Sequence, residues 1–242
     1  MLRLIDINVM LNHPVYQKDS TPDAIAKIID ADGVNAAIVS SLKPLASLDF
    51  DAGNKAVSEL VKNHPKKLFG FAIVNPIKLN QLETAMELLP FKGVRLSPNF
   101  MWIEYSEAMV PLIEFAAKQK MAVHVSVTPE RPSNMKMCAE IAERFPNTPV
   151  IMGQIWTPYT WVEASALSRG YKNIFLEVGF ATTKSIEDAV EVAGASKLIF
   201  GSGFPNMRPK AAVEIVKLAS ISEGDKELIF WKNASSLLGI SV

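Results

Sequence analysis

Leu2-Arg3-Leu4-Ile5-Asp6-Ile7-Asn8 is a short, mostly apolar run, and a longer amphipathic segment follows it after a turn. This pair of segments repeats to the end of the chain. Nearly continuous apolar runs are typical of strands that are buried on both faces. Strands are predicted at residues 2–8, 35–40, 68–75, 93–97, 122–126, 150–154, 174–178 and 198–202. Strands that alternate with helices in this way predict a single (β/α)8 TIM-barrel domain over residues 1–242, with short C-terminal helices.

A doubly wound open sheet is the alternative fold for such an alternation. It usually carries a glycine-rich turn after its first strand, and this chain has none there. Thr21-Pro22-Asp23 combines a capping hydroxyl with a proline at the first helical position and therefore predicts a helix start. Ser185 is expected to precede the helix at 186–193, and two short helices are expected near 223–231 and 234–238.

Charge and composition exclude several classes of partner. The 25 Lys and Arg residues balance 25 Asp and Glu residues, and no basic stretch is long enough to follow a phosphate backbone. No apolar run approaches the ~18 residues of a membrane span, and no charged leader precedes an apolar stretch. We therefore expect a cytoplasmic protein that binds neither nucleic acid nor membrane, with a homo-oligomer left open. The single cysteine, Cys138, lies between Met137 and Ala139 and is expected to be a buried, inert thiol.

The active site of a barrel of this kind lies at the C-terminal ends of its strands. The residues at or just after the predicted strand ends are Asp6, Asn8, Met10, Ser40, Ser41, Asn75, Arg95, Ser97, His124, Ser126, Gln154, Trp156, Glu177, Ser202 and Gly203. This set is polar, mixed in charge and poor in metal ligands.

Several segments carry a family resemblance. They are Lys92–Pro98 on the fourth strand, Met121–Val125 on the fifth, Phe145-Pro146-Asn147 through Gln154 on the sixth, Ile199–Pro205 on the eighth, and Asn233-Ala234 with Leu237-Leu238-Gly239 at the end. In this order and spacing they resemble the amidohydrolase-related (amidohydrolase 2) family of the amidohydrolase superfamily. The resemblance runs from the first strand to the C-terminus. It implies a TIM barrel and an activity among hydrolases, lactonases and decarboxylases.

The resemblance also implies where metal ligands would stand. The family's first strand ends in Asp-x-His-x-His, and this chain has Asp6, Asn8 and Met10 there. The strand-six histidine corresponds to Gln154 and the strand-eight aspartate to Gly203.

Of the usual ligand set only His124 remains, with Asp6 as an uncertain extra ligand. Asn, Gln and Met are weak ligands for zinc, which needs about four ligands from His, Cys and carboxylate. We therefore expect no cofactor and no metal. The alternative is a divalent ion such as zinc in a shifted site made by His13, His124 and Glu177.

His124 is the best candidate catalytic residue because an imidazole titrates near neutral pH. Asp6 and Glu177 are its candidate partners in proton transfer. The alternative is that His124 is a former ligand now held by hydrogen bonds. Arg95 is expected to clamp a carboxylate in bidentate fashion, and its alternative is an ion pair with Glu177 or Asp6. The further candidates for substrate binding are Asn8, Gln154, Trp102, Trp156 and Ser202.

Two functions follow from these residues. The first is a metal-independent hydrolase, such as a lactonase, or a metal-independent decarboxylase. Either would act on a small, anionic, carboxylate-bearing molecule. The second is a catalytically inactive barrel that binds a small molecule or a partner protein through the former active-site mouth. A hydrolase with a shifted metal site is a third, minor alternative.

Overall fold

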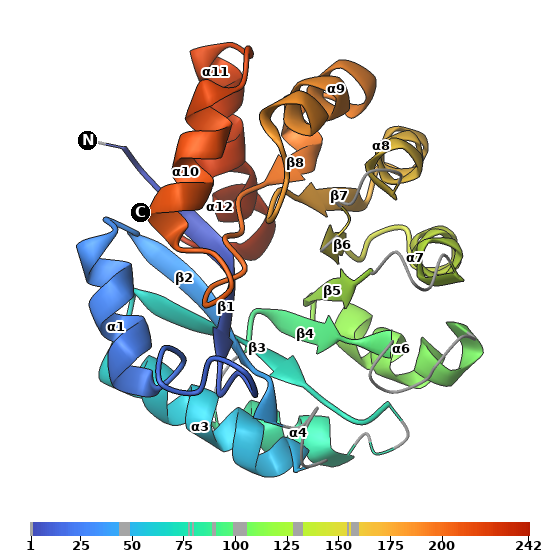
Figure 1. Cartoon of the computed structure of the whole chain (residues 1–242). Coiled ribbons are helices and arrows are strands. Elements are labelled where there is room, and N and C mark those ends of the chain that lie inside the picture. Colours follow the sequence, from blue (N-terminus) through green and yellow to red (C-terminus); the bar gives the residue numbers. More distant parts are fainter. Residues whose placement is uncertain are drawn as a thin grey trace.

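The protein folds as a ring of parallel strands surrounded by helices (Figure 1). The structure is a computed structural model and describes residues 2–43, 49–76, 78, 80–88, 91–98, 106–127, 133–153, 155 and 160–242. Neighbouring strands pair in chain order, all in parallel. They are β1 (Ile5–Leu11), β2 (Ala36–Ser41), β3 (Leu68–Ile73), β4 (Gly93–Leu96), β5 (Ala122–Ser126), β6 (Val150–Gly153), β7 (Ile174–Glu177) and β8 (Leu198–Ile199).

The ring closes between the first strand and the segment that follows the last one. The amide of Ile7 donates to the carbonyl of Phe200 over 3.1 Å, and the amide of Met10 donates to Phe204 over 2.8 Å. The amide of Gly203 donates to the carbonyl of Asn8 over 3.0 Å. These bonds bring the two ends of the sheet together, and the predicted (β/α)8 barrel is confirmed.

Helices alternate with the strands around the ring (Figure 1). The α-helices are α1 (Pro22–Ala31), α3 (Phe50–Asn63), α4 (Asn80–Leu88), α6 (Val110–Lys118), α7 (Ser133–Arg144), α8 (Thr160–Gly170), α9 (Thr183–Ala193), α10 (Pro209–Leu218), α11 (Glu223–Glu227) and α12 (Asn233–Leu238). The shorter helical segments are η1 (Ser106–Met109) and η2 (Ala195–Lys197), both 3-10 helices, and the π-helix η3 (Leu228–Lys232).

Two helix boundaries test the predicted caps. The Thr21 side chain accepts from the amide of Ala24 and caps α1, as predicted. At α9 the prediction was wrong by one turn: Thr182 is the N-cap and Ser185 is the third helical residue, and the two side chains form a reciprocal capping box. The two predicted tail helices are joined, because η3 fills the interval between α11 and α12.

Apolar side chains fill the end of the barrel interior near the starts of the strands. We call the following residues the apolar layer: Ile5, Ile7, Ile38, Phe71, Ala122, Ile151 and Ile199, which belong to one buried cluster. Ala234, Leu238 and Ile240 of the C-terminal segment belong to the same cluster and close this end. Burying each large side chain here contributes about 1.5–3 kcal/mol to stability.

A register shift in β1 decides which of its side chains face the interior. The shift lies between Asp6 and Val9 in the pairing with β2. Ile7 belongs to the apolar layer, whereas Val9 and Leu11 belong to the larger cluster that packs between strands and helices. The alternation of side chains is therefore broken at Asn8, which turns into the barrel directly after Ile7. The predicted strand at 2–8 was placed three residues too early, since β1 runs from Ile5 to Leu11.

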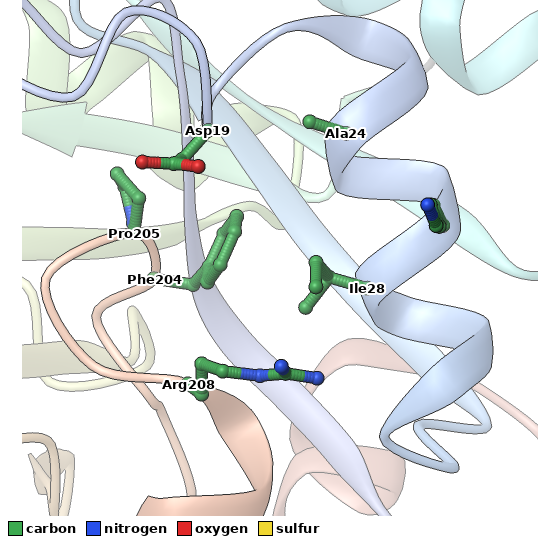
Figure 2. A pocket seen from close by; sticks show the side chains of 7 residues that line it. Asp19, Ala24, Ile28, Phe204, Pro205 and Arg208 are labelled. Carbon is green, nitrogen blue, oxygen red and sulfur yellow. The ribbon is translucent and has the colours of Figure 1, made fainter.

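One cavity of about 470 Å³ lies outside the barrel interior, between α1 and the segment after β8 (Figure 2). Phe204 and Ile28 face one another across it, with Asp19 and Arg208 toward opposite ends (Figure 2). The guanidinium of Arg208 forms an ion pair with Asp32, and the Asp32 carboxylate also accepts from the amide of Lys210.

Two further predictions concern burial. Cys138 is fully buried, and burial raises the pKa of its thiol to about 12, so the thiol is inert as predicted. Within the described part of the chain, no helix combines the length and the apolar character needed to cross a bilayer.

Candidate functional site

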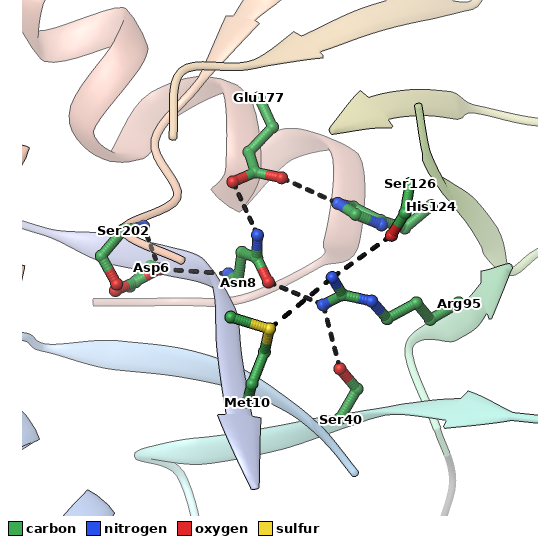
Figure 3. Close-up of polar contacts among 9 residues, drawn as sticks. All are labelled: Asp6, Asn8, Met10, Ser40, Arg95, His124, Ser126, Glu177 and Ser202. Atoms are coloured by element: carbon green, nitrogen blue, oxygen red, sulfur yellow. Dashed lines mark hydrogen bonds and ion pairs between the residues drawn. The ribbon is translucent and has the colours of Figure 1, made fainter. Parts of the chain in front are cut away.

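Arg95 lies at the centre of a buried polar cluster at the C-terminal ends of the strands (Figure 3). Its Nη1 donates to Asn8 Oδ1 over 2.6 Å and to Ser40 Oγ over 3.1 Å. Its Nη2 donates to Ser126 Oγ over 3.3 Å and approaches Met10 Sδ at 4.0 Å. Side chains from four strands, β1, β2, β4 and β5, therefore meet around one guanidinium.

These contacts limit what Arg95 can offer a ligand. A guanidinium has five N–H donors, and the contacts above occupy the four on Nη1 and Nη2. Nε is buried and has no hydrogen-bond partner among the described residues. Both Nη groups therefore already have partners, and a bidentate clamp on a ligand stays a prediction.

Asn8 connects Arg95 to a carboxylate and an imidazole. Its Nδ2 donates to Glu177 Oε1 over 2.8 Å, and Glu177 Oε2 lies 2.9 Å from His124 Nε2. The alternative of a direct ion pair between Arg95 and Glu177 is replaced by an indirect one through the Asn8 amide (Figure 3). We call the whole set the Arg95 network: Asn8, Met10, Ser40, Arg95, His124, Ser126 and Glu177.

The contacts of Glu177 fix the tautomer of His124. A carboxylate only accepts hydrogen bonds, so the proton between the two side chains belongs to Nε2 of the imidazole. Nδ1 then carries a lone pair, and it has no partner among the described residues. Burial lowers the pKa of His124 below its ordinary value, and the bond to Glu177 opposes this only in part. The imidazole is therefore neutral at neutral pH, with its lone pair on the buried Nδ1.

Glycines create the space that this pair occupies. A Cβ at Gly153 would lie 2.5 Å from Glu177 Oε2 and 2.6 Å from His124 Nε2. A Cβ at Gly201 would lie 2.6 Å from Glu177 Oε1, and one at Gly179 would lie 2.4 Å from the same atom. The carboxylate is enclosed by backbone from β6, from the segment after β7 and from the segment after β8, so its position is fixed by packing.

Asp6 lies beside the Arg95 network, and its carboxylate accepts hydrogen bonds from backbone amides. Its Oδ1 accepts from the amide of Asn8 over 3.1 Å and from the amide of Ser202 over 2.9 Å. Its Oδ2 is buried without a partner among the described residues. Burial raises the pKa of Asp6 to about 6, against the lowering effect of its bonds with Ser202 and Asn8. The sequence left open an ion pair between Asp6 and Arg95, and the hydrogen-bond partners of Asp6 are backbone amides instead.

Gly203, at the position of the family's strand-eight aspartate, does not leave empty space. Its φ is +70°, in the left-handed region, and a Cβ there would lie 2.6 Å from Cε2 of Phe180. An aspartate at this position would be strained and would collide with the ring. Phe180 itself has a φ of +63°. Nothing in the sequence indicated this residue, because its contact with Gly203 joins two separate loops.

The remaining predicted site residues differ in outcome. Ser202 is buried, and its Oγ accepts from the amide of Phe204 over 3.0 Å. Gln154, Trp102 and Trp156 lie outside the described residues. Ser40 and Ser126 were noted at strand ends without a role, and both are partners of Arg95.

The shifted metal site was proposed from three described residues, His13, His124 and Glu177. Nδ1 of His13 accepts from the amides of Val15 and Tyr16, each over 3.2 Å. Within the part of the chain that the structure describes, no group of three or more His, Cys, Asp or Glu side chains is placed to hold a metal ion. These three residues therefore do not form the proposed site.

A sequence model of the amidohydrolase family matches residues 5–240. The chain belongs to the amidohydrolase family. Its fold is similar to that of 5-carboxyvanillate decarboxylase from Sphingomonas paucimobilis, at 15% identity and a TM-score of 0.79, with 100% of each chain covered. No curated protein matches the chain in sequence.

Two further solved structures share the fold. One is a dihydroxybenzoic acid decarboxylase from a Polaromonas species with bound manganese, at 16% identity and a TM-score of 0.78, covering 99% of this chain and 97% of that one. The other is a candidate 2-pyrone-4,6-dicarboxylic acid hydrolase from Pseudomonas putida, at 16% identity and a TM-score of 0.75, covering 100% and 99%. At these identities the likeness establishes the fold.

The family implies a divalent metal at the mouth of the barrel, and the described residues do not fit one. Asn8 Oδ1 is occupied by Arg95 Nη1, and Met10 Sδ also faces the guanidinium. The retained imidazole of His124 directs Nε2 at Glu177. The side chains at the two first-strand ligand positions are thus neutral, weak ligands that already contact a resident cation.

Proposed function

We propose that this amidohydrolase-family barrel is a metal-independent enzyme that hydrolyses or decarboxylates a small, carboxylate-bearing molecule. The observation that carries the proposal is the Arg95 network, which joins a cation to an oriented, neutral imidazole through Asn8 and Glu177. Active sites of this fold lie at the same end of the barrel. The names of the structural neighbours, two decarboxylases and a candidate pyrone hydrolase, support this choice of substrate class.

Each group in the network has a role in this proposal. The fixed positive charge of Arg95 attracts the carboxylate of the substrate. Glu177 orients the imidazole of His124 and stabilises it when it gains a proton. His124 Nδ1 takes or gives that proton.

Hydrolysis uses the neutral imidazole. The oxygen of a water molecule bonds to the carbonyl carbon of a lactone or ester while Nδ1 of His124 accepts the proton. The carbon–oxygen bond to the leaving group then breaks, and the same proton passes to the leaving oxygen. Because burial lowers the pKa of His124, the base is in its active form at neutral pH.

Decarboxylation uses the protonated imidazole. The carbon–carbon bond to the carboxylate breaks, carbon dioxide leaves, and the electron pair that remains on carbon takes a proton from Nδ1 of His124. This requires His124 to be protonated first. The two reactions therefore depend on pH with opposite signs: hydrolysis increases as pH rises through the pKa of His124, and decarboxylation decreases.

The second candidate is an inactive barrel that binds a small molecule or partner at its mouth. It is favoured by one observation, namely that the side chains of the Arg95 network are at most 4% exposed and largely satisfy one another. A network of this kind also suits a structural role.

Turnover of a panel of carboxylate-bearing lactones, esters and aromatic acids separates the two candidates. We expect ring opening or carbon dioxide release by the metal-free wild type, a loss of about 10²–10⁴-fold in His124→Gln, and little change in His64→Ala. Glutamine keeps an amide donor toward Glu177 without supplying a base, and His64 lies in the turn at the opposite end of the barrel. Circular dichroism checks that each variant is folded.

Arg95→Met tests the role of the cation, with Arg169→Met on α8 as the control for the substitution. We expect KM to rise in Arg95→Met alone. The absence of turnover across the panel, or full activity in His124→Gln, would reject the enzymatic proposal and leave the binding barrel.

A further inference from the structure

The chemistry of the atoms around Arg95 is unusual for a charged group in a barrel interior. Its acceptors are an amide oxygen, two hydroxyl oxygens and a thioether, all of them neutral. Among the described residues, the anion joined to it is Glu177, which it reaches through Asn8. The guanidinium is thus coordinated by side chains in the way that an ion is coordinated by ligands, with Glu177 as its counter-charge.

The same atoms decide whether a second cation can enter. A divalent ion would have to displace Nη1 from Asn8 Oδ1, which it contacts over 2.6 Å, and would then lie beside a fixed positive charge in a buried site. Repulsion between a guanidinium and a divalent ion is twice that between two unit charges at the same distance. The imidazole of His124 cannot offer Nε2 without giving up Glu177. Among the described residues of the network and Asp6, this leaves His124 Nδ1 and Asp6 Oδ2 without partners, fewer than the roughly four ligands that zinc needs.

We infer that the guanidinium of Arg95 occupies the ligand positions where the divalent metal of the fold would bind, and that this guanidinium, more than the missing histidines, keeps the site closed to metal ions. This inference goes beyond the proposed function, because it applies whether or not the barrel turns over a substrate. It follows that restoring ligands alone does not restore a metal site. Ligands have to be restored and Arg95 removed together.

Metal binding by a set of variants tests this inference, with Zn²⁺ and Co²⁺ as the probes. Asn8→His with Met10→His offers two imidazoles while Arg95 stays in place. A second variant adds Arg95→Met to these two changes, and a third adds Arg95→Lys, which keeps the charge. Calorimetry with Zn²⁺, the visible spectrum with Co²⁺ and elemental analysis of the purified proteins measure binding without any need for activity.

The expected result is a clear order. The wild type, the histidine pair and the variant with Lys at position 95 bind no ion more tightly than about 100 µM. The variant with Met at position 95 binds one ion at least about 100-fold more tightly, with a Co²⁺ spectrum of nitrogen ligation. A stoichiometric ion in the purified wild type would overturn the inference. Equal affinity in the histidine pair with and without Arg95 would overturn it as well.

Folding of the variants does not decide the outcome. If the variant with Met at position 95 unfolds without metal, refolding in the presence of Zn²⁺ supplies the same comparison, because an ion that binds only the folded state raises Tm. The wild type gives an independent measurement: its Tm is expected to be unchanged by chelator and by each ion, and an increase with Zn²⁺ would contradict a closed site. If the wild type excludes metal ions but turns over no substrate, the proposed function is rejected and the inference about Arg95 stands.

Discussion

The apolar layer and the Arg95 network fill the same barrel, and on several strands they are only two residues apart. Ile38 is followed by Ser40 on β2, and Ala122 is followed by His124 on β5. The first member of each pair packs among aliphatic side chains, and the second makes hydrogen bonds that cross the barrel. Because alternate residues of a strand face the same side, two successive inward-facing residues belong to the apolar layer and to the Arg95 network, respectively.

The comparison teaches that the two layers depend on different kinds of contact. The apolar layer depends on side-chain volume, so replacing one of its residues by another apolar residue of similar size is tolerated. The Arg95 network depends on each donor having its acceptor, and removing one member leaves buried partners unsatisfied. The following changes separate the two layers, beginning with the largest expected effect.

Removing Glu177 breaks the polar layer most severely. Glu177→Ala leaves the Nε2–H of His124 and the Nδ2–H of Asn8 buried without acceptors and removes the counter-charge of Arg95. Breaking a buried, paired charge in this way costs about 3–5 kcal/mol. Urea unfolding measures the loss, with the exposed Glu163→Ala on α8 as the control. A loss below about 1 kcal/mol would mean that the network is not held as described.

Asp6 gives the polar layer a pH dependence that the apolar layer lacks. Its pKa of about 6 in the folded protein lies above the ordinary 3.8, so the folded state holds the proton more tightly. The resulting stabilisation is complete below pH 3.8 and is lost as pH rises through 6. A shift of this size corresponds to about 3 kcal/mol.

Asp6→Asn is therefore expected to gain stability relative to the wild type as pH rises from 4 to 7. Urea unfolding over this range measures the difference, and Asp51→Asn, at an exposed position on α3, serves as the control. Parallel stability curves for wild type and Asp6→Asn would contradict the raised pKa.

A single methyl group distinguishes the crowded polar layer from open surface. Gly153→Ala places a Cβ within 2.6 Å of both Glu177 and His124, and overpacking of this kind costs about 1–3 kcal/mol. Gly170→Ala at the end of α8 meets nothing within 4 Å and is expected to be neutral or slightly stabilising. Thermal unfolding of the two variants gives the comparison, and equal Tm values would show that the glycine is not needed for space.

The apolar layer is expected to respond least to a conservative change. Ile151→Val removes one methylene from a fully buried side chain and costs about 0.5–1.5 kcal/mol. Because the contact is one of volume, we expect the metal exclusion and the pH profile of any activity to stay as in the wild type. A changed pH profile in Ile151→Val would show that the two layers are coupled.

The fold could be predicted from the sequence because its signals are local. Ala122–Ser126 and Thr21-Pro22-Asp23 were placed correctly, since an apolar run and a capping residue act on their own neighbours. The family resemblance added the positions of the lost metal ligands. It gave no partner for Arg95.

The site could be predicted only in part, because its contacts are long-range. Asn8 and Glu177 are 169 residues apart, and Arg95 and Asn8 are 87 apart. The register shift after Asp6 is equally invisible in the sequence, where Ile5, Ile7 and Val9 keep a regular alternation. That shift turns Asn8 inward, and without it the indirect link between Arg95 and Glu177 could not be drawn.

The seam between β1 and the segment after β8 has a consequence for how the chain folds. One edge of the first strand pairs with β2, but the other edge finds its partners only at Phe200, Gly203 and Phe204. The Asp6 carboxylate likewise accepts from the amide of Ser202, 196 residues away. During synthesis these backbone groups stay unpaired until nearly the whole chain has emerged, and contacts of such separation form slowly. β1, which carries Asn8 of the Arg95 network, is thus synthesised first but completes its hydrogen bonds last. We expect the amide hydrogens of Ile7 and Met10 to exchange with solvent faster than those of β5.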